Sequence, residues 1–523
     1  VHFVHDVKHD GWHRGHLVAD GCLTEVPVES NCSGVVSFRG FRLLVFLAEL
    51  NSLKLWGTNI SSVFLETCAK EKVCILAGPE FAPLAGHRLI IDKALHDLRT
   101  SGQRWHDRFA ECLQSEGFVP CIAEPDVWMH AAGDACECVA VHMDDLAFAL
   151  KDPEAFAKTL HDKHGFNLKG TGELSFHPGA NFTQDEDGTL CMSPTKCISD
   201  HLMKSHEKMF GEKPKQTVLL PLESGDHPEL DTSELLDEDG TQQFQSLIGS
   251  LQWILSWRRF DMACAVMSLS SFCVAPRRGH LEQLKRVCGH LMKMQHFGIR
   301  FRTHEPDFNN LNTVEQNWFS VHGDVTKALP SNAPKALGKG VQLTHCVDAN
   351  LLHDVLTGRS ITACLHFVNG APIDWHSKKQ ATVETTTCSS KFVAARTCIE
   401  QTIDLHDTLR HLGVEVREKS FMFGDNKLVV NSASIIHLKL HKHHNAQLHH
   451  HVREAIASRH VDFNCIPGIQ NPADILSKQW AYGAVKDVLL PLFHQHGEIC
   501  MDGHNQGEQS CQIICTGHCT MMQ

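Results

Sequence analysis

Two adjacent carboxylates interrupt an apolar run in the first third of the chain. Asp144 and Asp145 lie between residues 138–143 and 146–150, and both flanks are rich in strand-forming residues. We predict a β-hairpin with buried flanks and both aspartates at its turn. With a third carboxylate from another strand, this pair could bind the Mg²⁺ ions of a phosphoryl-transfer site. A lone Asp-Asp pair is more often an acidic surface turn, so its context has to decide.

A second set of carboxylates occurs in the last third of the chain. Asp348 and Asp425 each follow a short apolar stretch, and Asp474 falls in the first turn of an expected helix. These are suitable residue types for a metal site of the ribonuclease H kind. Taken singly, Asp425 could instead cap a helix, and Asp474 could simply favour the positive end of a helix dipole.

The elements that must position these residues follow from the sequence pattern. Residues 92–116 are amphipathic and predict a pair of helices before the aspartate hairpin. Asp152 followed by Pro153 indicates a capped helix start. Apolar residues at a helical period make residues 243–294 strongly helical, and residues 341–490 alternate strands and helices as an α/β domain does.

Composition restricts the class of protein. The 523 residues suffice for about three domains, and no run of about 18 apolar residues predicts a membrane span. The chain opens on Val1 without a signal peptide, so we expect a fragment of an intracellular protein with reduced thiols. The net charge of −13 argues against nonspecific adhesion to nucleic acid, so any such binding needs a local basic groove. Unusually, 39 histidines and 22 cysteines accompany a single tyrosine.

Several specific motifs follow one another in a fixed order along the chain. They are Leu17–Gly21, Lys93–Leu95, Met143–Leu146, Gln245–Leu251, Arg259–Asp261, Trp375–Gln380 and Asn471–Lys478. Through these motifs the chain resembles, from Asp6 to about Trp480, the reverse transcriptase and ribonuclease H region of copia-type LTR retrotransposon polyproteins, in the variants found in algal genomes.

The resemblance implies an α/β and α+β multidomain fold, in which a right-hand polymerase of fingers, palm and thumb precedes a ribonuclease H-like α/β domain. Fingers and palm are expected in residues 1–170, and a thumb and connection region in 171–330. The ribonuclease H-like domain is expected in residues 341–490. Residues 491–523 form a tail without assignment.

The resemblance also implies two sites with distinct chemistry. In the palm, Asp144, Asp145 and the residue at position 59 would bind Mg²⁺ or Mn²⁺ while a primer 3′-hydroxyl attacks a dNTP. In the last domain Asp348, Asp425 and Asp474, with an acidic residue at position 389 or 391, would bind metal for cleaving RNA in an RNA–DNA hybrid. The expected partners are an RNA template, a DNA primer, the hybrid and dNTPs.

Substrate contacts are implied at four further positions. Arg14, His16 and Arg104 would contact the substrate, and His16 replaces an arginine expected to help hold the triphosphate, which weakens that contact at neutral pH. Phe64 is expected where an aromatic side chain excludes the ribose 2′-hydroxyl, although a core phenylalanine is an equally good interpretation.

The sequence departs from the family pattern in both sites. Position 59 is Asn59, a neutral and poor Mg²⁺ ligand, so one anionic ligand is missing and a loss of roughly 10²–10³-fold in rate is expected. The helix that should bring a glutamate has Ser389 and Lys391 instead, and Lys391 would repel metal. Glu384 lies nearby but precedes the helix.

These departures leave several functions open. The first is a reverse transcriptase with ribonuclease H activity, impaired in this copy. The second is a catalytically silent relic of the element that binds only nucleic acid or metal; substitution of expected tyrosines by His or Cys fits such decay. A more remote alternative is a His-rich metal-binding protein. We expect location in a cytoplasmic particle or the nucleus and leave the oligomeric state open.

Overall fold

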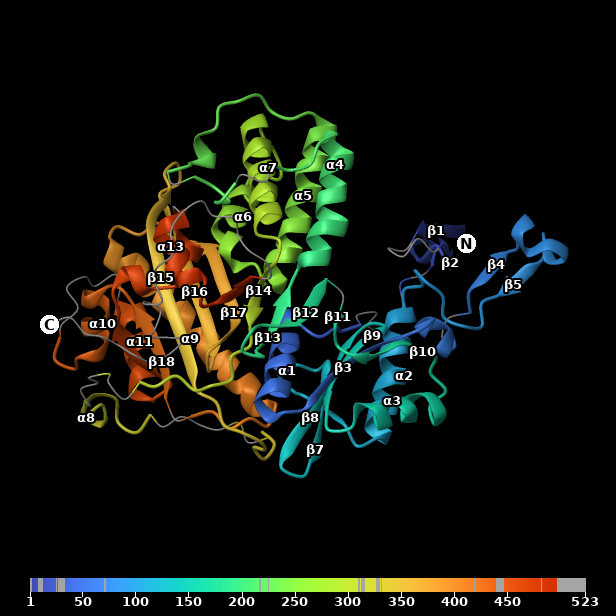
Figure 1. Cartoon of the computed structure of the whole chain (residues 1–523), viewed down its shortest axis with the longest axis horizontal. Helices are drawn as coiled ribbons and strands as arrows, with labels where there is room; N and C mark the ends of the chain where they lie inside the picture. The colour runs from blue at the N-terminus through green and yellow to red at the C-terminus, as the bar shows by residue number, and fades with distance from the viewer. Residues whose placement is uncertain are drawn as a thin grey trace. The chain divides into compact units, whose positions relative to one another are not determined.

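The chain forms two compact units, Val1–His177 and Pro178–Gln523, which are described separately (Figure 1). The computed structural model describes residues 2–7, 13–24, 26, 33–69, 72–177, 179–215, 218–223, 225–308, 311, 316–325, 330, 332–417, 419–438, 446–480 and 482–495. Both units combine helices and β-sheets, which confirms the predicted multidomain α/β and α+β class. Across these residues, no helix has both the length and the apolar character required to cross a membrane.

A six-stranded antiparallel sheet organises the first unit, with strand order β10-β3-β9-β8-β7-β6. The strands are β3 (Lys54–Ile60), β6 (Val119–Pro120), β7 (Val127–Ala132), β8 (Ala135–His142), β9 (Asp145–Leu150) and β10 (Leu168–Glu173). The two central strands, β8 and β9, pair with each other and form the predicted aspartate hairpin, and β3 pairs with the other edge of β9.

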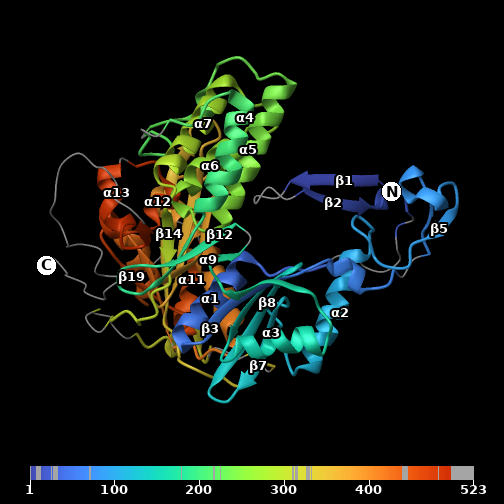
Figure 2. The ribbon, with the colours of Figure 1, turned by 45° about the vertical axis from the view of Figure 1, so that its right-hand side comes forward.

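The two faces of this sheet carry side chains of different size. Leu146 and Phe148 of β9 join a core with Trp105 of α2 (Ser101–Ser115) and Leu160 of α3 (Pro153–Asp162). The alternate residue, Ala147, points to the opposite face, where α1 (Phe38–Asn51) contacts β8 and β9 (Figure 2). Small alanines allow this buried helix to approach the backbone of the sheet.

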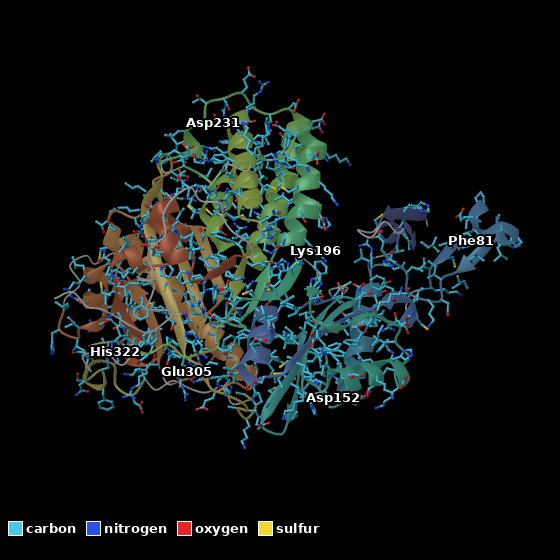
Figure 3. All side chains as sticks on the ribbon, viewed as in Figure 1. Phe81, Asp152, Lys196, Asp231, Glu305 and His322 are labelled. Carbon is cyan, nitrogen blue, oxygen red and sulfur yellow. The ribbon has the colours of Figure 1, made fainter. Side chains whose placement is uncertain are left out.

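Local sequence signals explain where several elements begin. Asp152, marked in Figure 3, caps α3 by accepting a hydrogen bond from Ala155 N at 3.1 Å, as predicted. Two hairpins complete the described part of the unit: β1 (His2–Val7) with β2 (His13–Val18), and β4 (Cys74–Leu76) with β5 (Arg88–Ile90).

The predicted helix pair over residues 92–116 is only half right. Residues 101–115 form α2, but residues 92–100 are irregular, and Asp97 has a φ of +67° that is incompatible with a continuing helix. Ala94 is buried there, and Leu98 packs against Ala19 and Ile91. Packing against this neighbouring segment outweighs the local helical pattern.

A helical layer and a small sheet form the first half of the second unit. The helices are α4 (Met203–Phe210), α5 (Glu238–Trp257), α6 (Ala263–Ser270) and α7 (Arg278–Lys293), and the antiparallel strands are β12 (Ala180–Gln184), β13 (Leu190–Ser193), β14 (Phe297–Arg300) and β20 (Phe493–Gln495). The helical prediction for 243–294 is confirmed, and Leu247, Leu251 and Ile254 lie in the core shared by these helices.

A mixed five-stranded sheet forms the second half, with order β17-β16-β15-β18-β19. Its elements are β15 (Leu343–Asp354), β16 (Arg359–Val368), β17 (Ala371–Lys379), α9 (Thr387–His411), β18 (Ser420–Gly424), α10 (Lys427–Ser434), α11 (Ala446–Ala457), β19 (Val461–Cys465), α12 (Asp474–Ser477) and α13 (Tyr482–Leu489). The pairs β17–β16 and β16–β15 are antiparallel, whereas β15–β18 and β18–β19 are parallel. The long helix α9 packs on β15 and β16.

A buried ion pair fixes the loop between α5 and α6. Arg259 donates from Nε to Asp261 Oδ1 at 2.8 Å and from Nη2 to Oδ2 at 2.7 Å, and His290 Nε2 lies 3.0 Å from Oδ2. Burial alone would raise the pKa of Asp261, but the Arg259 charge and these hydrogen bonds hold that pKa well below its ordinary value.

We expect Asp261→Asn to lower the free energy of unfolding by about 3–5 kcal/mol at neutral pH, because it leaves the buried Arg259 charge without a counterion. The pKa of Asp261 is lower in the folded state than in the unfolded state, so its carboxylate stabilises the fold at pH values above the ordinary Asp pKa. This contribution is lost as the pH falls through the folded-state pKa. Urea unfolding at neutral and acidic pH measures this: the difference in the free energy of unfolding between the variant and the wild-type protein should become smaller as the pH is lowered. The exposed Asp487→Asn is the control, and an equal effect of both substitutions would contradict the prediction.

Candidate active sites

The predicted aspartate hairpin is confirmed, and its turn is held from two sides. Strand β8 ends and strand β9 begins at this turn, where Met143 adopts a φ of +58°. The Trp105 indole of α2 donates to Met143 O at 2.9 Å, and Ile60 N of β3 donates to Asp144 O at 2.8 Å. These two bonds fix a backbone conformation that a non-glycine residue seldom adopts.

Asn59 lies directly against both aspartates. It is paired with Asp145 in the register of β3 and β9. Its side-chain Nδ2 donates to Asp144 Oδ2 at 2.8 Å and to Asp145 Oδ1 at 3.0 Å. The structure thus brings together the three residues expected at the polymerase site, with an amide group between two carboxylates.

This arrangement fits a divalent cation only in part. Carboxylate oxygens are ligands that Mg²⁺ prefers. The amide nitrogen, however, is a hydrogen-bond donor and already bridges the two carboxylates, so it would have to move away before both could bind one ion. The site has two of the three anionic ligands that the family resemblance implies.

The other residues expected to contact substrate lie at differing depths. Phe64, in the 3-10 helix Val63–Glu66, packs against the unit's core and makes an edge-to-face contact with His96 at 4.8 Å between ring centroids. Arg104 precedes Trp105 on α2 and is half-buried. Arg14 and His16 belong to β2, but their side chains lie outside the described residues.

The second set of aspartates also converges. Asp348 lies on β15, Asp425 directly follows β18, and Asp474 begins α12; one carboxylate oxygen of each lies within 4.8 Å of the others. Asp348 and Asp474 are buried. Asn471 helps position α12, because its amide donates to Val347 O on β15 at 3.0 Å.

Two lysine ammonium groups occupy this cluster. Lys391 of α9 donates to Asp348 Oδ1 at 2.7 Å and also to Asp425 Oδ1. Lys478 lies 3.0 Å from Asp474 Oδ1 and 3.3 Å from Asp348 Oδ2. The Ser477 hydroxyl also donates to Asp348.

The charges of the cluster balance without a metal. Burial opposes ionisation of Asp348, but the ammonium groups of Lys391 and Lys478 hold its pKa below the ordinary value. For Asp474, burial and the neighbouring Asp348 charge raise the pKa to about 8, so this carboxyl is largely protonated at neutral pH. Two carboxylates, at Asp348 and Asp425, then face two ammonium groups.

The residues of this second site therefore do not fit a pair of divalent cations. The Lys391 ammonium lies between the two ionised aspartates, where a metal would have to bind. Ser389, at the other position where a glutamate was expected, is buried and donates to Glu384. Glu384 also accepts from Thr382 at 2.7 Å, so its carboxylate is engaged beside the helix start.

Sequence reasoning missed three contributors to these sites. No role was predicted for Trp105, Ser477 or Lys478. The spacing of four residues between Asp474 and Lys478 on an expected helix was a signal for their ion pair. The contact between Trp105 and the hairpin turn, 38 residues away along the chain, left no local signal.

We expect Lys391→Met to create a response to Mg²⁺ that the wild-type protein lacks at this cluster. Without the ammonium, Asp348 and Asp425 repel each other, so the variant should melt at a lower temperature in metal-free buffer and recover stability on addition of Mg²⁺. Thermal unfolding with and without Mg²⁺ measures this. The exposed Lys427→Met on α10 is the matched control, since both variants keep Asn59, Asp144 and Asp145 unchanged. An equal Mg²⁺ response in both would refute the expectation.

The sequence of the chain is similar to those of known proteins. Residues 1–215 match the family described as reverse transcriptase (RNA-dependent DNA polymerase). The chain is 22% identical over 495 residues, 91% of its length, to the retrovirus-related Pol polyprotein from transposon TNT 1-94 of Nicotiana tabacum. It is 22% identical over 419 residues, 79% of its length, to the corresponding polyprotein from transposon RE1 of Arabidopsis thaliana. The chain spans 34% and 26% of the length of these two relatives.

Solved structures with some likeness are reverse transcriptases and ribonucleases H. The foamy viral protease-reverse transcriptase dRH in complex with double-stranded DNA aligns with 88% of this chain and 64% of its own at 11% identity, with a TM-score of 0.45. The N-terminal ribonuclease H domain of a Mycobacterium tuberculosis protein aligns with 26% of this chain and 91% of its own at 14% identity, with a TM-score of 0.22.

Residues 1–215 thus match the reverse transcriptase family, and the resemblance of the chain to the Pol polyproteins of copia-type retrotransposons is confirmed over most of its length.

Proposed function

We propose that this chain is the polymerase and ribonuclease H portion of a retrotransposon polyprotein, and that its first unit carries out template-directed nucleotidyl transfer at a reduced rate. The observation that supports this most directly is the meeting of Asn59, Asp144 and Asp145 at the β8–β9 hairpin, inside the region that matches the reverse transcriptase family. The proposed partners are an RNA template, a DNA primer and dNTPs.

The geometry suggests how each residue contributes. A divalent cation, when bound, would supply the positive charge that activates the primer hydroxyl and stabilises the leaving phosphate. Asp144 and Asp145 would hold that charge, and Trp105 would keep the turn that presents both carboxylates in place. Asn59 adds no negative charge and donates to both aspartates, so it competes with the cation for the same oxygens.

For the last domain we propose binding of an RNA–DNA hybrid without cleavage. The specific observation in favour is the pair of ammonium groups of Lys391 and Lys478 among the aspartates. Recognition of a duplex through its backbone and shape needs no metal, so this binding would survive the loss of chemistry. This is the part of the chain to which the alternative of a silent relic applies best.

We expect Asn59→Asp to raise the rate of Mg²⁺-dependent primer extension on an RNA template by roughly 10²–10³-fold, since it restores one preorganised charge at the reacting centre. The measurement is single-nucleotide extension by purified wild-type and variant protein. Asp144→Asn in the same preparation is the inactive control.

Two outcomes would contradict this prediction. Equal rates for the wild-type protein and Asn59→Asp would mean that the amide is tolerated. Absence of extension by either protein, with primer–template still bound and the fold intact, would mean that Asn59 does not limit the reaction and that the proposed polymerase function fails in this copy.

We expect the wild-type chain to leave an RNA–DNA hybrid intact and Lys391→Glu to gain Mg²⁺-dependent cleavage. The substitution removes the ammonium and places a carboxylate where the family pattern expects one. The assay is release of labelled RNA from a hybrid, with Lys427→Glu as a control of equal charge change. Cleavage by the wild-type protein that Asp348→Asn abolishes would refute the proposal that this site is silent.

A further inference from the structure

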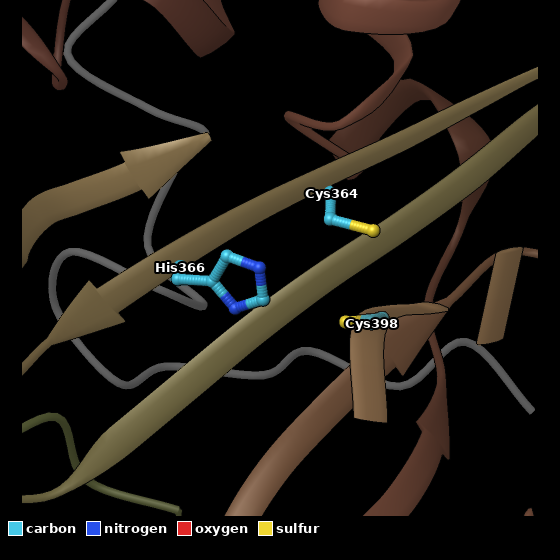
Figure 4. Close-up of side chains that lie close together, drawn as sticks. All are labelled: Cys364, His366 and Cys398. Carbon is cyan, nitrogen blue, oxygen red and sulfur yellow. The ribbon is translucent and has the colours of Figure 1, made fainter. Parts of the chain in front are cut away.

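A cluster of sulfur and imidazole donors lies inside the last domain, apart from the aspartates discussed above. Cys364 and His366 belong to β16, and Cys398 belongs to α9. One ligand atom of each lies within 4.8 Å of the others, and Figure 4 shows the three side chains grouped between the strand and the helix. All three residues are at most 1% exposed.

The fold places these donors on one face for a simple reason. Residues 364 and 366 are two apart on a strand, so both side chains point to the same side of the sheet. The helix α9 packs against β15 and β16, and Cys398 joins Cys364 in the apolar core that also contains Phe392 and Val347. The packing of the helix on the sheet therefore brings the three donors together without any contribution from a loop.

The His366 ring is oriented as a metal-binding imidazole usually is. Its Nδ1 lies 2.8 Å from His345 Nδ1, and its Nε2 lies 3.0 Å from Gln401 Oε1. Whichever nitrogen bound an ion, the other would keep a hydrogen-bond partner that fixes the ring, as outer-shell partners of metal ligands commonly do.

His345 lies next to His366, but it is not one of the three donors whose ligand atoms lie within 4.8 Å of one another. It is fully buried, and its Nε2 has no hydrogen-bond partner among the residues that the structure describes. Full burial disfavours the charged form of the ring, and a neutral imidazole retains one lone pair. An imidazole with an unsatisfied nitrogen in the core is costly unless something occupies that lone pair.

Charge balance decides which kind of ion would suit this core. Cys364 is fully buried, so an isolated thiolate at this position would be unfavourable. A divalent cation bound by two thiolates and neutral imidazoles has no net charge. Sulfur and imidazole ligands favour Zn²⁺, whereas Mg²⁺ prefers oxygen.

We propose that Cys364, His366 and Cys398 bind a structural Zn²⁺ ion that links α9 to β16, and that the neighbouring His345 moves to supply the fourth ligand. Binding releases the two thiol protons to solvent and forms two zinc–sulfur bonds. The site would stabilise the last domain whether or not either acidic site is active, so it does not depend on the proposed polymerase function.

The first test is the metal content of the full chain, purified under reducing conditions without chelator. We expect one zinc per chain in the wild-type protein and in Cys288→Ser, whose thiol is equally buried but lies in the core of the helical layer. Cys398→Ser should contain no zinc, and a strong chelator should lower the melting temperature of the wild-type protein but not that of Cys398→Ser.

If Cys398→Ser fails to fold, the absorption spectrum of the wild-type protein with Co²⁺ in place of zinc tests the same proposal. The wild-type protein should show thiolate-to-cobalt charge-transfer bands of the intensity that two thiolates give, together with the strong visible bands of a tetrahedral site. Absence of these bands with both thiols freely titratable, or a Cys364–Cys398 disulfide, would overturn the proposal. A one-thiolate spectrum that Cys191→Ser abolishes would also overturn it, because Cys191 lies in a different cluster, with Asp185 and His494.

Discussion

Carboxylates that a fold holds side by side repel each other, so they need a partner that supplies positive charge or donor hydrogens. Both acidic sites of this chain obey that constraint without a metal. In the first unit the Asn59 amide bridges Asp144 and Asp145, and in the second the ammonium of Lys391 bridges Asp348 and Asp425. The surrounding strands can therefore keep their positions whether or not a cation binds.

Because of this requirement, a substitution can weaken metal binding at a site and still leave the fold around it intact. A substitution that removes an anionic ligand weakens metal binding, but one that also adds a donor hydrogen lowers the electrostatic strain among the remaining carboxylates. Asn59 does this with a neutral amide, and Lys391 does it with a full charge. In the second site the ammonium groups already compensate the carboxylates, so no divalent ion is required. In the first site only the neutral Asn59 amide contacts the two carboxylates, so their negative charge is still available to a cation.

Local patterns in the sequence predicted the elements that carry the sites, since those elements depend on short-range signals. The apolar, strand-forming flanks of Asp144 and Asp145 identified the hairpin, Asp152 and Pro153 identified the start of α3, and the helical period identified α5 to α7. The predicted convergence of Asp348, Asp425 and Asp474 is confirmed, but it came from the family resemblance rather than from spacing. The missing first helix of residues 92–100 and the Trp105 contact depend on packing between distant segments, which leaves no periodic trace.

The same reasoning explains why the Cys364, His366 and Cys398 cluster escaped the sequence analysis. Zinc sites are recognised in sequences by closely spaced ligand pairs, and the 22 cysteines contain no Cys-x-x-Cys pair. Here one ligand pair lies on a strand at a spacing of two, and the third ligand comes from a helix 32 residues further along the chain. Only the packing of α9 on β16 brings them together. In a chain with 39 histidines and 22 cysteines, a core can acquire soft donors through tertiary packing alone, and the neutral charge of a zinc–dithiolate unit is what would allow such a group to remain there.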